Sequence, residues 1–155
     1  METNELNKQE KQRHGFVTFW LWLGIIGNVI SLFMTVISFS QMSSVWSLDG
    51  GQTLRIHYLI FATITAIGGI AIIACYGMIL NWKKNGFWGA IVVAVVVGIV
   101  NVIMMNLIEK DCASMGLFVD LNPVTQVIAT PLSLLVLWAI LQLKKDGESC
   151  WKQLE

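Results

Sequence analysis

The sequence predicts an all-α integral membrane protein built as a four-helix bundle. Its 155 residues are 55% apolar and 13% charged, with a mean hydropathy of +0.68. Four segments contain no Asp, Glu, Lys or Arg, namely residues 16–39, 57–82, 86–108 and 121–143. A helix rises ~1.5 Å per residue, so each segment reaches at least ~34 Å and can cross a hydrocarbon core of ~30 Å. A soluble bundle is disfavoured because its helices would carry polar faces, which these segments lack.

We expect one transmembrane domain, residues 16–145. Its spans cover about residues 16–40, 57–82, 86–108 and 121–143. A polar segment, residues 1–15, precedes the domain, and a tail, residues 146–155, follows it. The first apolar run is longer than the roughly 7 to 15 residues of a signal peptide and lacks a small-residue cleavage site, so we expect it to be retained.

The basic residues predict the side of the membrane on which each connection lies. Eight of the ten fall before the first span, between the second and third, or after the fourth: Lys8, Lys11, Arg13, Lys83, Lys84, Lys144, Lys145 and Lys152. Only Arg55 and Lys110 fall in the other two connections. Cytoplasmic segments carry the excess of Lys and Arg, which predicts that both termini and the central connection are cytoplasmic.

Two similar basic stretches end the second and fourth spans, ILNWKKNG at residues 79–86 and ILQLKKDG at residues 140–147. Lysines at a helix C-terminus suit the helix dipole and reach toward lipid phosphates. A following glycine in left-handed geometry can close the last turn. The predicted cytoplasmic stop and cap residues are Lys83, Lys84, Gly86, Lys144, Lys145 and Gly147.

The chain can also be interpreted as two tandem helical hairpins. RHGF at residues 13–16 parallels KNGF at residues 84–87, and GIIGNVI at residues 24–30 is similar to GIVNVI at residues 98–103. Duplication would give a parallel repeat about the membrane normal. The alternative is that any two short-looped hairpins that follow one charge rule look alike.

The third span carries small residues at every fourth position, namely Gly86, Ala90, Ala94 and Gly98. Residues four apart share one side of a helix. Helices in lipid associate through close backbone approach, because lipid tails are as apolar as leucine. We predict that this face forms the closest helix contact in the molecule or in its dimer.

Four polar side chains lie within or near the spans: Asn28, Asn101, Asn106 and Gln126. Each can hydrogen-bond across helices for roughly 0.6–2 kcal/mol. Ion and proton paths normally need a charged residue inside the membrane, and the predicted spans have none. Structural hydrogen bonding is therefore favoured, with a substrate path as the alternative.

Both prolines lie in the fourth span. Pro123 follows Asn122, a plausible helix cap, at a position where a first-turn proline is tolerated. Pro131 lies deeper, removes a backbone hydrogen bond and crowds the carbonyl group of Val127, which predicts a kink. Such a bend can fit a bundle or open a pocket.

No residue set for catalysis, cofactor binding or metal coordination stands out. Cys75, Cys112 and Cys150 are expected in three separate environments, so they form neither a disulfide framework nor a zinc site. The sequence has no phosphate-binding or dinucleotide-binding glycine motif and no convincing nucleophile, base and acid set. We expect no enzyme, no cofactor, no metal site and no nucleic-acid partner.

The stretches GFVTFWLWL at residues 15–23, WKKNGF at 82–87 and LKKDGESCW at 143–151 resemble a loose group of small four-span bacterial membrane proteins that have no assigned activity. The resemblance covers nearly the whole chain and implies a bacterial cytoplasmic membrane. It supplies no catalytic residues.

Packing faces without catalytic sets or buried charges favour an interaction or accessory protein. Its expected partners are the lipid bilayer and either another membrane protein or a second copy of the chain. The alternative is a small transporter or channel formed by oligomerisation, with Asn28, Asn101 and the Pro131 bend along its path.

Overall fold

The computed structural model describes residues 14–117, 123–145 and 148–154, with side chains described for 14–117, 132–144 and 149–154. The long helices are α1 (Gly15–Gln41), α2 (Gly51–Leu80), α3 (Asn85–Ser114) and α4 (Pro123–Leu141). A 3-10 helix, η1 (Met42–Ser47), follows α1, and β1 (Lys144–Lys145), β2 (Glu148–Ser149) and α5 (Cys150–Gln153) follow α4. Apart from the small β1–β2 hairpin, the predicted all-α fold is confirmed for these residues.

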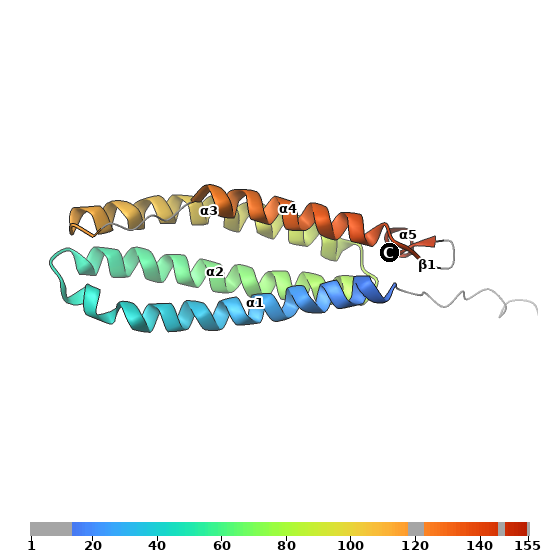
Figure 1. Ribbon diagram of the computed structural model, residues 1–155, viewed down its shortest axis with the longest axis horizontal. Coiled ribbons are helices and arrows are strands. Elements are labelled where there is room, and N and C mark those ends of the chain that lie inside the picture. The colour runs from blue at the N-terminus through green and yellow to red at the C-terminus, as the bar shows by residue number, and fades with distance from the viewer. Residues whose placement is uncertain (1–13, 118–122, 146–147, 155) are drawn as a thin grey trace, which may run out of the picture.

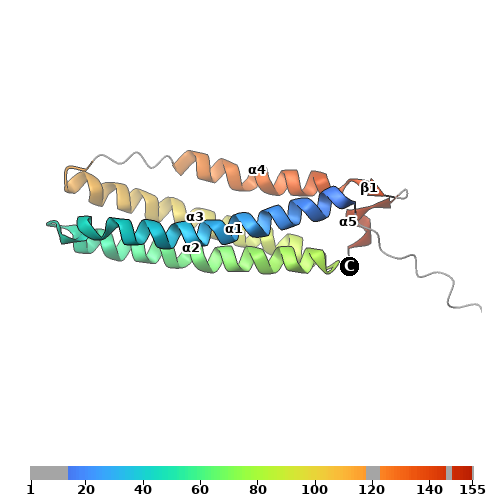
Figure 2. The same ribbon diagram turned by 60° about the horizontal axis from the view of Figure 1, so that its bottom comes forward.

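Consecutive long helices run antiparallel, and α3 lies beside both α2 and α4 (Figures 1 and 2). The most extensive contact joins α2 to α3, and the next joins α1 to α2. The start of α1, the α2–α3 connection and the C-terminal hairpin lie at one end of the bundle (Figure 1). We call it the lysine end, because Lys83, Lys84 and Lys144 lie there.

Among the described residues, three segments are long and apolar enough to cross a membrane: Gly15–Ser47, Gly51–Leu80 and Asn85–Ser114. The structure extends two of the predicted spans. α2 begins six residues before the predicted position 57, and α3 continues past position 108 through Glu109, Lys110 and Asp111. A charge-free run predicts the part of a helix that fits in hydrocarbon, whereas the helix itself can continue into water. Each of these helices has 30 residues and is therefore about 45 Å long.

Helix α2 ends differently from the prediction. Trp82 takes the left-handed conformation with φ 62°. The N–H of Lys83 donates to the carbonyl oxygen of Met78 at 2.9 Å, and the N–H of Trp82 donates to that of Ile79 at 3.0 Å. This is the Schellman pattern, which satisfies the last carbonyl groups of a helix. Gly86 lies inside the first turn of α3 without a positive φ, so its predicted role as a left-handed cap is wrong.

The glycine cap appears instead at the end of α3. Gly116 has φ 72°, and the N–H of Leu117 donates to the carbonyl oxygen of Cys112 at 2.9 Å. A second bond runs from the N–H of Gly116 to the carbonyl oxygen of Ala113 at 3.0 Å. Glycine has no Cβ to oppose this conformation. The predicted cap at Gly147 lies outside the described residues.

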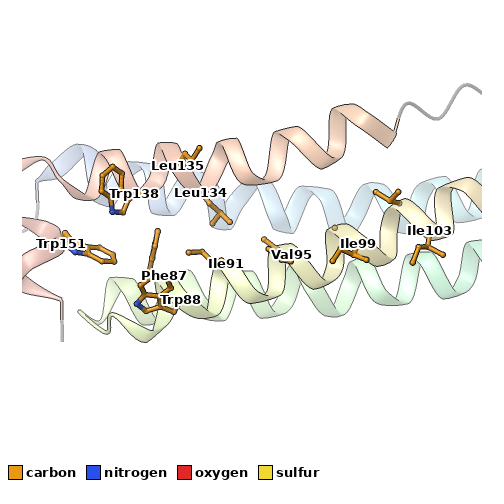
Figure 3. Close-up of a pocket in the computed structure, with 13 residues that line it drawn as sticks. Phe87, Trp88, Ile91, Val95, Ile99, Ile103, Leu134, Leu135, Trp138 and Trp151 are labelled. Carbon is orange, nitrogen blue, oxygen red and sulfur yellow. The ribbon is translucent and has the colours of Figure 1, made fainter.

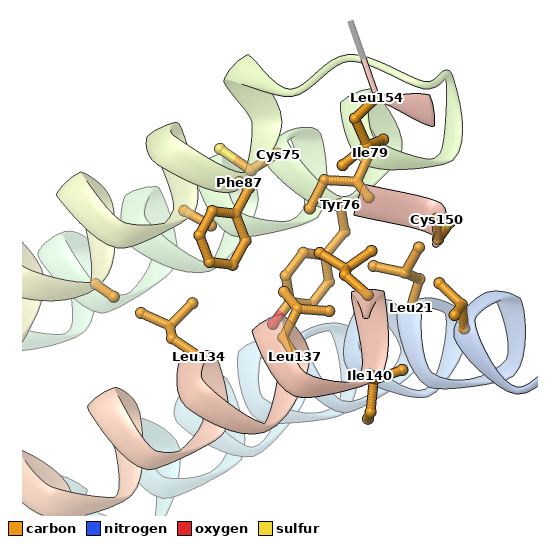
Figure 4. Packing of buried hydrophobic residues seen from close by; sticks show 14 residues of the cluster. Leu21, Cys75, Tyr76, Ile79, Phe87, Leu134, Leu137, Ile140, Cys150 and Leu154 are labelled. Carbon is orange, nitrogen blue, oxygen red and sulfur yellow. The ribbon is translucent and has the colours of Figure 1, made fainter. Parts of the chain in front are cut away.

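Two apolar clusters hold the bundle together. The larger lies toward the lysine end and joins all four long helices (Figure 4). Its buried members in these helices are Val17, Leu21, Cys75, Tyr76, Ile79, Phe87, Ala90, Ala94, Leu134, Leu137, Ile140 and Leu141. The smaller contains Leu54, Ile108 and Cys112, near the start of α2 and the end of α3. The middle of the bundle lies between these clusters.

The chain after α4 folds back onto the lysine end. Strands β1 and β2 pair antiparallel, with Lys144 opposite Ser149. The side chains that follow are buried, since Cys150 is 2% exposed and Leu154 is 6% exposed, and both join the larger cluster. The segment predicted to be a tail therefore supplies part of the core.

An aromatic contact fixes the position of α5. The rings of Trp151 and Phe87 meet edge to face, with centroids 5.1 Å apart. The ammonium nitrogen of Lys84 lies 4.7 Å from the centroid of the Trp151 ring. Aromatic pairs and cation–π contacts each contribute roughly 0.5–1.5 kcal/mol. One predicted stop lysine thus contacts the C-terminal segment.

Helix α1 exposes most of its apolar surface. It buries only Val17 and Leu21, whereas Phe33 is 67% exposed and Val36 is 69% exposed. A contiguous apolar surface of this kind is unfavourable in water and suits a hydrocarbon environment.

Candidate functional site

A cavity of about 260 Å³ lies in the middle of the bundle, bordered by all four long helices. Its polar lining residues are Asn28, Ser31, Thr65, Tyr76, Asn101 and Ser133. No described lining residue has a charged side chain. Amide and hydroxyl groups in an apolar protein suit a neutral hydrogen-bonding molecule better than an ion, which would lose its hydration without a compensating charge.

The hydrogen bonds of the cavity leave capacity for a ligand. The hydroxyl of Thr65 donates to Oδ1 of Asn101 at 3.3 Å and joins α2 to α3. Nδ2 of Asn28 donates to the carbonyl oxygen of Gly24 at 2.8 Å, within α1. In the described part of the chain, Nδ2 of Asn101 and Oδ1 of Asn28 have no hydrogen-bond partner. A side-chain amide both donates and accepts, so each residue can bind a further polar group.

A larger groove of about 940 Å³ lies between α3 and α4 (Figure 3). Its described lining is apolar and aromatic: Phe87, Trp88, Ile91, Ala94, Val95, Gly98, Ile99, Val102, Ile103, Leu134, Leu135, Trp138 and Trp151. Several of these side chains are more than half exposed, including Val95 at 52% and Ile99 at 59%. The groove is therefore open on the side of the bundle.

The groove and the central cavity share three lining residues, Ala94, Gly98 and Leu134. A Cβ atom added at Gly98 would meet no heavy atom of the described residues within 4 Å. The two spaces are therefore separated by small residues of α3 and by one leucine of α4. We call these three residues the joint.

The predicted packing face of α3 divides into two parts. Gly86, Ala90 and Ala94 are buried. A Cβ added at Gly86 would lie 2.5 Å from the backbone oxygen of Cys75, which shows a close approach of α2 and α3. Gly98 makes no such approach to a described residue within the chain, and its predicted packing role in a dimer stays a prediction. Small residues at every fourth position mark one side of a helix. They do not indicate how much of the length of that side is in contact with a neighbouring helix.

The predicted polar residues also have different roles. Only Asn101 makes an interhelical hydrogen bond among the three whose side chains are described. Nδ2 of Asn106 donates to the carbonyl oxygen of Val102 at 2.8 Å, within α3. The side chains of Gln126, Pro131 and Lys145 lie outside the described set. The kink at Pro131 stays a prediction.

Sequence reasoning missed two glycines beside the cavity. A Cβ at Gly24 of α1 would overlap the Tyr76 ring, and one at Gly68 of α2 would lie 2.7 Å from Cγ2 of Val97. Both glycines permit close helix approach. An added Cβ at the nearby Gly27 meets nothing within 4 Å, whereas one at Gly69 would lie 3.3 Å from Cδ2 of Leu32. Composition alone therefore does not indicate which glycines lie in helix contacts.

A polar contact between α2 and α3 was also missed. Nδ1 of His57 and Oδ2 of Asp111 are 2.6 Å apart, near the smaller cluster. Asp111 belongs to α3, beyond the predicted end of the third span at residue 108, and His57 belongs to α2. No group of three or more His, Cys, Asp or Glu side chains in the described ranges is arranged to hold a metal ion.

Comparison of the chain with known protein families, with curated proteins and with solved structures finds no match. The functional conclusion therefore depends on the groove, the cavity and the charge distribution.

Proposed function

We propose that this is a four-span protein of the bacterial cytoplasmic membrane with both termini in the cytoplasm. Three long apolar helices support membrane insertion. Helix α4 has 19 residues and is about 28 Å long, close to a hydrocarbon core of ~30 Å. The antiparallel order brings the start of α1 and the C-terminal segment to the lysine end (Figure 1). Arg55 lies near the start of α2 and Lys110 near the end of α3, so both belong to the helix ends that are far from the lysine end. The bacterial setting rests on the sequence resemblance.

Within the membrane, the protein acts as an accessory component that binds a partner without chemically changing it. The supporting observation is the groove between α3 and α4, because it is open on the side of the bundle that faces lipid in the proposed topology. A partner would reach it by diffusing in the plane of the membrane. The described residues of the lining offer apolar contact surface and no group for acid–base or nucleophilic catalysis.

Site-specific photo-crosslinking in living cells tests this function. A photoreactive amino acid at Val95 lies in the groove, and the same amino acid at Val36 lies on the exposed surface of α1 as the matched control. A binding role predicts one discrete, saturable adduct from position 95 and only diffuse lipid adducts from position 36. Identical adduct patterns at the two positions would contradict a specific binding face.

A small transporter or channel, formed by several copies, is the second candidate. The observation in its favour is that Asn28 and Asn101 both line the central cavity. Flux through liposomes that contain the purified protein tests this candidate. Solute or ion flux that disappears in Asn101→Leu would replace the accessory role by transport.

A further inference from the structure

We propose that the groove and the central cavity form one binding site for an uncharged amphipathic lipid, with its polar head in the cavity and its apolar chain in the groove. This inference rests on the proposed binding function and names the class of ligand. It combines a neutral polar cavity, an apolar open groove, and three described residues that line both spaces.

The joint is the geometric basis of the proposal. Ala94, Gly98 and Leu134 each border both spaces, and a Cβ added at Gly98 would meet no heavy atom of the described residues within 4 Å. A lipid chain that enters between α3 and α4 meets no bulky α3 side chain at Ala94 or Gly98. Leu134 lies on the α4 side of the groove, and a rotamer change there alters the width of the joint (Figure 3).

The head must be small and uncharged. The cavity volume of about 260 Å³ corresponds to roughly eight water molecules, so it holds a head of only a few heavy atoms. Asn28 and Asn101 offer an acceptor and a donor that have no partner among the described residues, and these match a hydroxyl, ester or amide group. No described cavity residue would neutralise a carboxylate or an ammonium group, so a charged head would lose its hydration without compensation.

The apolar chain of the lipid must be long. From Phe87 to Ile103 the groove follows α3 for about 24 Å, more than half of a ~30 Å hydrocarbon core. Its volume of about 940 Å³ lies at the upper end of the roughly 300–1,000 Å³ typical of ligand pockets. A chain moving from lipid into the groove exchanges one apolar environment for another. Selection must therefore come from the head in the cavity.

An anionic phospholipid is the competing ligand, because Lys84 lies beside Trp151 at the lysine end of the groove. Its head would bind at that lysine and would leave the central amides unused. A lipid bound in this way would depend on Lys84 and not on Asn101. The two ligands are therefore distinguished by substitution.

Native mass spectrometry of the full-length protein in detergent tests the proposal. The probes are monooleoylglycerol, which has a neutral head, oleate, which has a charged head, and an alkene of matching chain length. One bound monooleoylglycerol is expected, with an apparent affinity at least about tenfold above those of oleate and the alkene. Equal retention of the three probes would overturn the proposal, because it would indicate nonspecific adsorption.

Two variants locate the head and the joint. Asn101→Val should weaken monooleoylglycerol binding by about fivefold or more and leave alkene binding unchanged, which a general folding defect would not do. Gly98→Leu should block the joint, whereas Gly27→Leu is the matched control because an added Cβ there also meets nothing within 4 Å. Unchanged binding in both Asn101→Val and Gly98→Leu would overturn the proposal.

Lys84→Gln should not affect monooleoylglycerol binding. If an anionic phospholipid were retained instead and were lost in Lys84→Gln, the ligand class would be wrong. A discrete protein adduct from position 95 in cells, together with no selective lipid binding, would overturn this inference and leave the accessory function intact.

Discussion

Substitution of Gly86 by alanine should destabilise the bundle, although the same change in most helices is favourable. An added Cβ would lie 2.5 Å from the backbone oxygen of Cys75 and 2.8 Å from Cβ of Met78, where ordinary van der Waals contact begins at about 3.4 Å. The oxygen belongs to the α2 backbone, so it cannot move aside as a flexible side chain would. Helices α2 and α3 must separate locally.

Opposing terms determine the magnitude. Alanine in place of glycine stabilises a helix by roughly 0.5–1 kcal/mol. Overpacking of a close contact costs about 1–3 kcal/mol. We therefore expect Gly86→Ala to lower the free energy of unfolding by up to about 2.5 kcal/mol. At Gly98 no heavy atom of the described residues lies within 4 Å of an added Cβ, so Gly98→Ala should raise it by up to about 1 kcal/mol.

Thermal unfolding of the purified protein in one detergent provides the measurement. For a chain of this length, 1 kcal/mol shifts the Tm by roughly 2–4 °C. Gly86→Ala should lower the Tm, and Gly98→Ala should raise it, with Gly27→Ala as a second glycine whose added Cβ meets nothing within 4 Å. If Gly86→Ala raised the Tm as much as Gly98→Ala does, the close approach of α2 and α3 would be refuted.

Three further predictions concern a helix cap, a polar pair and the topology. Gly116→Ala should lower the free energy of unfolding by about 1 kcal/mol, because a φ of 72° is unfavourable for a residue with a Cβ. Thermal unfolding measures this loss. Gly15→Ala is the control and should show no loss of stability, because an added Cβ there meets nothing within 4 Å. A double-mutant cycle with His57→Gln and Asp111→Asn should give a coupling energy of roughly 0.2–1 kcal/mol, since the two side chains are 26% and 19% exposed and solvent partly screens their interaction. Strictly additive effects would mean that the contact contributes nothing. Cys75, Cys112 and Cys150 are 8%, 1% and 2% exposed, so topology is better read from cysteines introduced at the exposed Asp49 and Lys83 after the native ones are replaced. In intact cells an impermeant maleimide should label Asp49→Cys and spare Lys83→Cys, and the reverse pattern would invert the proposed orientation.

The structure supports some local predictions and corrects others for a common reason. The helical character of the apolar segments follows from composition and length, which are properties of each segment alone. The prediction that Gly86 caps α2 also relied on a local pattern, namely a glycine shortly after two lysines. The chain instead ends α2 with Trp82 in left-handed geometry, and Gly86 lies where α3 approaches the Cys75 carbonyl group. A tertiary contact thus changed the role of a residue whose neighbours matched the local motif.

The candidate site was predictable only in part. Asn28 and Asn101 were recognised as unusual because polar residues are rare in such segments, and both line the cavity. The Thr65 bond to Asn101 and the His57 contact with Asp111 join residues far apart in the chain, so no local pattern indicates them. The burial of Cys150 and Leu154 was missed because the polar residues around them resemble those of an exposed tail.

By itself, the sequence determined the helical character of the chain and the placement of its long apolar segments, because the free energy of placing a segment in hydrocarbon depends on its own length and charge. The tertiary structure decided which side of each helix faces a neighbour. Helices that are apolar all round carry little periodic signal for that choice, since lipid and protein are similarly apolar environments. Close packing at Gly24, Gly68 and Gly86, and the open space at Gly98, therefore exist only once four helices have been rotated into a common bundle.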